Sequence, residues 1–480
     1  MQYNVFQVFV FFAVLLSFVS TDMRIVCYYA NWSLYRLPHT PILYPDYIDP
    51  SLCTHIHAAF ALINPTTLKI EPSEKHDTNF SDKFGTSLYL RLNKLKRYRP
   101  SLKLLLAVGG WNARSEAFNN ILTNSSTRAT FIRQTKQFLK GWNFDGIDLD
   151  WEFPGDIERG AMNNSREEFN ILIKEMHESF HNHSNPFLLT AAVTADPIKV
   201  DNGYVVPDFC HHLDYVSVMT YDYHGSWDNV TGVNAPLYGK YAAENDTDDD
   251  GQWKNVNNSI HYWLSNGCPA EKLNLGLALY GRSFTLANNS DSVSIGTETI
   301  GSGIAGPFTK ENGTLAYFEI CQKLRLYNWT RVFDTDVQAP YAYSSGSSTL
   351  EKQWVGYDDL KSVTVKVLYA KTMNLGGAML WSLDQDDFTG LYCQQGAFPF
   401  TRRVRDILVS SNKTIEEESS YSTKPRSKQT SKFIPIHRRT SQKYRSSLTS
   451  TLRSNAASVC VRSNVILYLF SIISFKILTR

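Results

Sequence analysis

The stretch Phe144-Asp-Gly-Ile-Asp-Leu-Asp-Trp-Glu-Phe-Pro-Gly155 threads four carboxylates through bulky apolar residues. The carboxylates are Asp145, Asp148, Asp150 and Glu152, all within eight positions. A solvated acidic run would lack apolar neighbours such as Ile, Leu, Trp and Phe. The stretch therefore predicts a buried strand that carries acids into the interior.

The alternation along this strand predicts one acidic face. Residues two apart point to the same side, so Asp148, Asp150 and Glu152 project together, with roughly 6.5–7 Å between successive positions. The intervening residues, which face covering helices, are Ile147, Leu149 and Trp151. Like charges in a low-dielectric interior raise the proton affinity of at least one carboxyl, and a carboxyl protonated near neutral pH suits the general acid of glycosidic-bond cleavage. A carboxylate metal site or an acidic loop is disfavoured, because hard-metal ligands usually come from turns rich in Gly, Asn and Asp.

Seven other apolar, β-rich runs resemble this one. The eight runs span residues 24–30, 55–62, 103–108, 144–151, 187–193, 215–220, 273–279 and 377–383. Continuous apolar runs are typical of parallel strands buried on both faces, and the amphipathic helix at 165–180 fits a crossover connection. The pattern predicts an α/β fold, a (β/α)8 TIM barrel with its site at the carboxyl ends of the strands. The Gly-, Ser- and Tyr-rich interval at about 285–357 predicts an inserted α+β subdomain before the last strand.

The charge of the chain is divided unequally. Residues 401–480 contain sixteen Lys or Arg and four Asp or Glu, a net +12, whereas the whole chain carries +2 and the first 400 residues therefore −10. This balance argues against a nucleic-acid groove on the folded part. Residues 406–460, rich in Ser, Thr, Lys and Arg, are expected to form a disordered or O-glycosylated stem after a catalytic domain at 21–405.

Both ends of the chain are apolar. Residues 1–20 resemble a secretory signal peptide, with a buried strand or a membrane anchor as the alternative. Residues 461–480, with the small residues at 454–458 before them, resemble a GPI-attachment signal, and a short spanning helix or no anchor are the alternatives. Twelve Asn-x-Ser/Thr sequons also favour secretion. We expect an extracellular protein, either secreted or anchored at the cell surface.

The cysteines and histidines provide no convincing metal site. Seven cysteines without any C-x-x-C spacing predict a few stapling disulfides. His177-Glu-Ser-Phe-His181 fits H-E-x-x-H, but imidazoles at a helix carboxyl end are favoured by the dipole without any metal. Asp246-Thr-Asp-Asp-Asp-Gly251 matches only the first half of a calcium loop. We expect no metal and no cofactor.

Several motifs carry a family resemblance. The acidic strand matches the D-G-x-D-x-D-x-E signature of glycoside hydrolase family 18, the chitinases and chitinase-like lectins, and the animal branch resembles it most. The matching motifs over about residues 23–400 are Cys27-Tyr-Tyr-Ala-Asn-Trp32, Ala59-Phe60, Gly109-Gly-Trp-Asn112, Asp145-Gly-Ile-Asp-Leu-Asp-Trp-Glu152, Met219-Thr-Tyr-Asp222, Tyr280-Gly-Arg-Ser-Phe284, Trp354-Val-Gly-Tyr-Asp-Asp359 and Gly376-Gly-Ala-Met-Leu-Trp381. The resemblance implies the same barrel.

The resemblance also implies roles for individual residues. Glu152 would be the general acid, Asp150 would orient the substrate acetamido group, and Asp148 and Tyr221 would assist. The residues expected to contact the substrate are Tyr28, Phe60, Gly110, Trp111, Asp145, Phe153, Met219, Asp222, Tyr280, Arg282, Met379 and Trp381. By the same resemblance, disulfides join Cys27 to Cys53 and Cys321 to Cys393. The pairing of the remaining cysteines stays open.

The resemblance implies a chitinase that cleaves β-1,4 bonds between N-acetylglucosamine units with retention of configuration. The substrate's own acetamido group would act as nucleophile. We expect a monomer whose partner is chitin or its oligosaccharides. The alternatives are a chitin-binding lectin, which would have lost the acid, and an endo-β-N-acetylglucosaminidase acting on glycoproteins. The presence of Glu152 and Asp150 favours an enzyme over a lectin.

Overall fold

The computed structural model describes residues 23–36, 40–79, 86–182, 186–239, 253–287, 292–346 and 352–410. The expected signal peptide, the calcium-like loop at 246–251, most of the stem and the apolar tail lie outside these residues. All of the described residues belong to one unit within Met1–Ser422. Within the described ranges, no helix combines the length and the apolar character that crossing a membrane requires.

Eight parallel strands close into a barrel, as predicted. They are β1 (Arg24–Ala30), β2 (His55–Ile63), β4 (Lys103–Gly109), β5 (Gly146–Asp150), β6 (Leu188–Val193), β7 (Tyr215–Val218), β8 (Leu273–Ala278) and β15 (Gly377–Trp381). The ladder runs β1-β15-β8-β7-β6-β5-β4-β2, and pairing of β1 with β2 closes it. The short β3 (Ile70–Pro72) adds antiparallel to β2. Nearly every strand residue is buried, because helices cover the outside and side chains fill the lumen.

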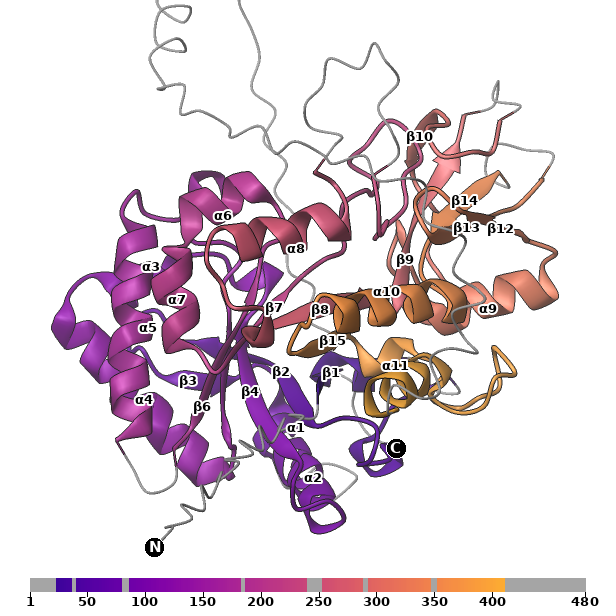
Figure 1. Ribbon diagram of the computed structural model, residues 1–480. Coiled ribbons are helices and arrows are strands. Elements are labelled where there is room, and N and C mark those ends of the chain that lie inside the picture. The colour runs from indigo at the N-terminus through magenta and orange to yellow at the C-terminus, as the bar shows by residue number, and fades with distance from the viewer. Residues whose placement is uncertain are drawn as a thin grey trace, which may run out of the picture. The chain divides into compact units, whose positions relative to one another are not determined.

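Helices form the outer layer around the strands. Those of the barrel are α1 (Lys75–Thr78), α2 (Leu88–Lys94), α3 (Glu116–Leu122), α4 (Ser125–Trp142), α5 (Ser165–His181), α6 (Pro197–Gly203), α7 (Val206–His212), α8 (Val256–Ser265), α10 (Leu360–Thr372) and α11 (Pro399–Val409). Figure 1 shows α3 to α7 together outside the strands. The predicted apolar stripe of α5 is buried. Helix α11 extends past residue 405, where the basic composition had suggested the end of the domain, because its apolar side packs on α10 and β1.

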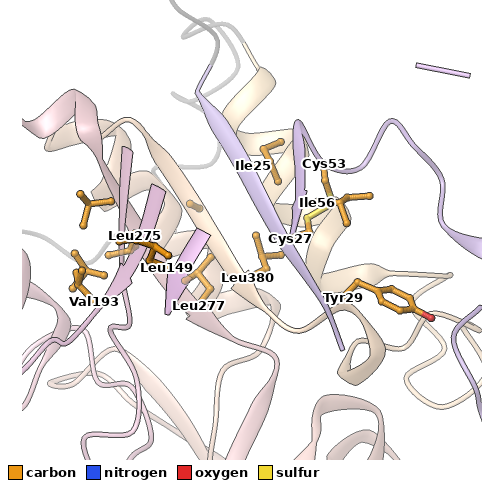
Figure 2. Packing of buried hydrophobic residues seen from close by; sticks show 14 of the residues in the cluster. Ile25, Cys27, Tyr29, Cys53, Ile56, Leu149, Val193, Leu275, Leu277 and Leu380 are labelled. Atoms are coloured by element: carbon orange, nitrogen blue, oxygen red, sulfur yellow. A yellow bond between two sulfur atoms is a disulfide. The ribbon is translucent and has the colours of Figure 1, made fainter. Parts of the chain in front are cut away.

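The outward faces of the strands form the main core. Figure 2 shows some of the residues of this core, among them Leu149 of β5, Val193 of β6, Leu275 and Leu277 of β8 and Leu380 of β15. The predicted alternation of β5 is confirmed by Trp151, which follows the strand and stacks on Phe118 of α3 at 4.8 Å between ring centroids. These contacts fix which side of β5 faces the helices. The acids at 148 and 150 therefore face the lumen.

An antiparallel sheet lies between β8 and β15. Its elements are β9 (Tyr280–Leu286), β10 (Thr299–Ser302), β11 (Thr314–Ala316), α9 (Tyr317–Leu326), β12 (Thr330–Asp334), β13 (Ala339–Tyr343) and β14 (Gln353–Gly356). The order is β10-β9-β14-β13-β12, with β11 on β9, and Figure 1 shows these strands at the opposite side from α3 to α7. The insertion was predicted to begin at about residue 285. It begins at Tyr280, because β9 follows β8 after one residue and pairs with this sheet instead of the barrel.

Three disulfides staple the described residues. Cys27 pairs with Cys53, joining β1 to the segment before β2, as Figure 2 shows. Cys321 pairs with Cys393. These are the two pairs that the family resemblance implies, and the third joins Cys210 to Cys268, whose pairing had been left open.

Candidate active site

The acidic side chains gather at the carboxyl ends of the barrel strands, the face that holds the active site in barrels of this kind. Asp148 lies inside β5, Asp150 ends it, and Glu152 lies two residues beyond its end. Tyr221 follows β7, and Trp381 ends β15. Five residues from three strands therefore meet at one rim. The predicted strand at 144–151 is shorter in the structure, but the alternation holds for the two aspartates.

Asp148 is fully buried and well supported. Its Oδ2 accepts a hydrogen bond from the Tyr28 hydroxyl at 2.5 Å, and its Oδ1 accepts one from Thr190 Oγ1 at 2.6 Å. His57 Nδ1 lies 3.3 Å from Oδ2, and its Nε2 bonds the Tyr215 hydroxyl at 2.9 Å. Burial acts to raise the pKa of Asp148, but His57 and these hydrogen bonds outweigh it and lower the pKa. Asp148 is therefore an ionised carboxylate.

Asp150 has the opposite environment. It is 3% exposed, and its Oδ1 accepts no hydrogen bond from the described residues. Burial raises the pKa of Asp150 well above its ordinary value, and the neighbouring charges of Glu152 and Asp148 raise it further. Burial thus favours the protonated form of Asp150 in the free protein. Its unpartnered oxygen is an acceptor available to a ligand.

Glu152 is partly exposed at the rim. Burial raises its pKa to about 7, with Asp222 acting in the same direction and the cations Arg159 and Lys199 acting against it. A carboxyl with a pKa near 7 is matched to proton donation and proton uptake at neutral pH. Glu152 therefore has the proton affinity of a general acid.

Tyr221 and Asp222 form the next part of the rim. The Tyr221 hydroxyl lies 3.8 Å from Met379 Sδ, to which it donates. Asp222 accepts from the Tyr280 hydroxyl at 2.7 Å and, in a two-point ion pair, from Arg282 Nε at 2.7 Å and Nη2 at 2.6 Å. Because Tyr280 and Arg282 belong to β9, this network ties the inserted sheet to the barrel rim.

Aromatic rings make a continuous apolar shelf beside the acids. Trp381 stacks on Phe60 at 5.5 Å between centroids, and Phe60 stacks on Trp32 at 5.9 Å. Trp32 is 42% exposed, and Trp111, beyond β4, is 56% exposed. Flat aromatic faces next to polar edges suit pyranose rings, whose C–H faces are apolar and whose hydroxyls point outward. The shelf and the acids together fit a carbohydrate.

Gly110 allows the shelf to form. Its φ of +82° is in the region that favours glycine, and a Cβ there would lie 2.6 Å from the Phe60 ring. We expect Gly110→Ala to lower the free energy of unfolding by about 2 kcal/mol and to raise KM several-fold, because Phe60 must move off Trp381. Urea denaturation and kinetics would measure both effects. The control is Gly141→Ala in α4, where a Cβ meets nothing within 4 Å and where we expect a small gain in stability.

Most of the predicted contact residues lie at this rim, but Asp145 does not. Asp145 precedes β5, forms a salt bridge with Lys96 at 2.5 Å and accepts from the Leu104 backbone N–H at 2.7 Å. It lies at the amino end of the strand, so its assignment to the substrate is wrong. The prediction placed every acid of the motif at the site, but the first of them, Asp145, forms a structural ion pair at the opposite end of the strand. Phe153, directly after Glu152, is nearly buried under Lys199, whose Nζ lies 4.8 Å from the ring.

Met219 and Met379 contribute apolar surface from inside the barrel. Met379 is buried with Tyr28 in the lumen cluster, and Met219 packs against it from beyond β7. The sequence interpretation missed His57, Thr190 and Arg159. The two histidines of β2 alternate with apolar residues, so His57 could have been assigned to the lumen by the same period of two as the acids. No such signal marks Arg159.

The two histidines of the H-E-x-x-H segment form hydrogen bonds with backbone carbonyl groups. His177 Nδ1 bonds the His212 carbonyl at 2.8 Å, and His181 Nδ1 bonds the His177 carbonyl at 2.9 Å. Over the described part of the chain, no group of three His, Cys, Asp or Glu side chains is arranged to hold a metal ion.

Comparison with known proteins places this geometry in context. The sequence matches the family described as glycosyl hydrolases family 18 over residues 24–386. Chitotriosidase-1 of Mus musculus is 38% identical over 409 residues, which cover 84% of this chain and 82% of that protein. Among solved structures, the Group II chitinase catalytic domain 2 of Ostrinia furnacalis has a TM-score of 0.73 at 35% identity, covering 81% of this chain and 96% of that one.

Another similar structure has a different activity. Human YKL-39, described as a pseudo-chitinase with retained chitooligosaccharide binding properties, has a TM-score of 0.71 at 37% identity, covering 81% of this chain and all of that one. Similar proteins therefore include both chitinases and a binding protein. Similarity alone does not decide between hydrolysis and binding, so the side chains of the site must.

Proposed function

This chain belongs to glycosyl hydrolases family 18, and we propose that it is a chitinase that hydrolyses β-1,4 bonds between N-acetylglucosamine units. One observation carries the proposal. The unpartnered Oδ1 of the buried Asp150 lies on the strand that leads to Glu152, whose pKa of about 7 makes it a proton donor at neutral pH. An acceptor for an acetamido N–H thus adjoins an acid for the leaving group.

The first half of the proposed reaction breaks the glycosidic bond. Glu152 gives its proton to the glycosidic oxygen while the bond from that oxygen to the anomeric carbon breaks. The acetamido carbonyl oxygen of the sugar over Trp381 forms the new bond to the anomeric carbon, giving an oxazolinium ion. Asp150 accepts a hydrogen bond from the acetamido N–H, and as a carboxylate it stabilises the positive charge that develops there. The Tyr221 hydroxyl donates a hydrogen bond to the acetamido oxygen and holds that oxygen in line with the anomeric carbon.

The second half returns the site to its starting state. Water attacks the anomeric carbon, the ionised Glu152 takes the water proton, and the bond to the acetamido oxygen breaks. Two displacements give a product with retained configuration. No protein nucleophile is required in this scheme.

Binding without hydrolysis is the second candidate function, since human YKL-39 is described as a pseudo-chitinase. The aromatic shelf alone would serve a lectin. Glu152 and Asp150, with their raised proton affinities, are costly to bury and have no use in binding alone, and this favours the enzyme.

Secretion is part of the same proposal. Three disulfides are typical of an oxidising compartment. Most of the sequon asparagines in the described residues are exposed. Asn257 is partly buried, and Asn31 is buried, where its side chain donates to both carboxylate oxygens of Asp77. Attachment through the C-terminal tail rests on sequence alone.

The test compares N-acetylglucosamine oligomers with their deacetylated forms. We expect the acetylated oligomers to be cleaved, with the β-anomer released first in NMR spectra, and the deacetylated oligomers to resist. Equal cleavage of both would refute the role of the acetamido group. Binding of acetylated oligomers without cleavage would indicate the lectin, and release of N-glycans from glycoproteins without cleavage of chitin oligomers would indicate the endo-β-N-acetylglucosaminidase.

A further inference from the structure

A short segment after β5 carries an arginine that the proposed reaction does not use. The 3₁₀ helix η5 (Ile157–Arg159) is fixed at its start, where Asp156 Oδ1 accepts from the Arg159 backbone N–H at 3.2 Å, and it ends at Gly160 in the left-handed region. The segment places the Arg159 side chain beside the loop that carries the acid.

The Arg159 guanidinium joins two strand-end loops. Its Nε donates to the backbone carbonyl of Glu152 at 2.7 Å, and its Nη2 donates to the backbone carbonyl of Trp111. The same guanidinium lies 3.4 Å from the centroid of the Trp111 ring. A planar guanidinium is well suited to combine stacking with two directed hydrogen bonds. Arg159 is thus in contact with the loops after β4 and β5 at once.

The Trp111 indole is held on one side and open on the other. Arg159 covers one face, while the residue as a whole remains 56% exposed. In the proposed function the reacting sugar lies over Trp381, at the end of the shelf that runs through Phe60 to Trp32. Trp111 is tied through Arg159 to the loop of Glu152, so its free face is available to the sugar on the leaving side.

We propose that Arg159 is a positioning residue that fixes the Trp111 indole, relative to the backbone of Glu152, as the floor for the sugar on the leaving side of the scissile bond. The inference rests on the proposed function for the direction of cleavage. Removing Arg159 frees the indole to rotate and loosens the loop that carries the acid. Substrates that reach Trp111 should lose more affinity than substrates that end before it.

The charge of Arg159 provides a second measurable effect, which is a change in the pKa of Glu152. The groups that act on Glu152 are the cations Arg159 and Lys199 and the acids Asp222 and Asp150. Arg159 opposes the effect of burial, so its removal should raise the pKa of Glu152 and move the alkaline limb of activity to higher pH. A substitution that only disturbed the fold would lower the rate without this movement.

The first experiment measures binding, without hydrolysis, in the Glu152→Gln background. We expect Arg159→Gln to weaken binding of the N-acetylglucosamine hexamer by about tenfold in calorimetry, and binding of the dimer much less. Trp111→Ala should have a similar effect, and the double variant should lose little more, because both changes remove one platform. Additive losses, or an unchanged hexamer affinity, would overturn the proposal. The control is Arg133→Gln on the exposed side of α4, which removes the same charge and should change nothing.

The second experiment separates charge from shape in the active protein. Arg159→Lys keeps the charge but loses the planar fork, so we expect a raised KM with the alkaline limb near that of the wild type. Arg159→Gln should show both the raised KM and the shifted limb. Equal pH profiles and KM values in wild type and Arg159→Gln would contradict the inference. If the wild type binds but does not hydrolyse, the proposed function fails, while the binding experiment still decides the role of Arg159.

Discussion

Replacing Glu152 by Gln is expected to lower kcat by about 10³-fold while oligomer binding is retained. General acid catalysis typically contributes 10²–10⁴-fold, and an amide of the same shape has no proton to give at any working pH. The change also removes the base that activates water in the second step, so no alternative group at position 152 takes over. Kinetics on acetylated oligomers and calorimetry of their binding would measure the two effects separately.

The difference in stability between the same variant and the wild type should depend on pH in a definite direction. The pKa of Glu152 is raised to about 7 in the folded protein, so ionisation of this group costs stability once the pH exceeds its ordinary value of 4.5, and the cost is complete above about pH 7. Gln carries no such cost. The Tm of Glu152→Gln should therefore equal that of the wild type at low pH and exceed it at high pH.

Glu158 provides the matched control for this prediction. It is an exposed acid in the same loop, and Glu158→Gln makes the same chemical change without touching the reacting atoms. We expect its kcat to remain near that of the wild type. Substantial hydrolysis in Glu152→Gln would exclude Glu152 as the proton donor, and an equal loss in both variants would point to a general charge effect.

The central part of the fold could be predicted from β5 alone. The period of two along residues 147–151 placed Trp151 toward α3 and the aspartates toward the lumen, because only that choice buries the apolar residues against helices. The barrel followed from eight runs of the same kind. The start of the insertion could not be predicted well, since Tyr280–Leu286 follows the barrel strand β8 after a single residue and only its pairing shows which sheet it joins.

The candidate site, like the fold, could be predicted from the sequence only in part. Asp148 and Asp150 belong to one strand, so local periodicity sufficed to bring them together. The contacts that lower the pKa of Asp148 come from elsewhere in the chain, such as His57 on β2 and Thr190 on β6, and no local pattern specifies such pairing. The position of Asp145 was wrong for a related reason. An acid at the amino end of a strand looks the same in sequence as one at the carboxyl end, and only Lys96 reveals the difference.

Asp150→Asn should lower kcat by about 10²–10³-fold, the range seen when one preorganised charge-stabilising group is lost. Asn retains an oxygen that accepts the acetamido N–H, but it cannot become negative as the oxazolinium charge develops. The expected pH profile distinguishes this variant from Arg159→Gln. Burial and the neighbouring acids Glu152 and Asp148 raise the pKa of Asp150 well above its ordinary value and so favour its protonated form. Asn resembles that protonated form, so the alkaline limb of kcat/KM should stay near pH 7.

Asp150→Ala completes the test, because it removes the acceptor oxygen as well as the charge. We expect a further loss in kcat and weaker binding of acetylated oligomers, with no change in binding of deacetylated ones. If Asp150→Asn retained the wild-type kcat, charge stabilisation by Asp150 would be excluded and the oxazolinium route would lose its main support. If its alkaline limb moved clearly to lower pH, Asp150 would be ionised in the free protein, since removing a neighbouring negative charge lowers the pKa of the remaining acid. Glu152 would then keep its proton to a higher pH than Asp150, which is the opposite of the order that their burial favours.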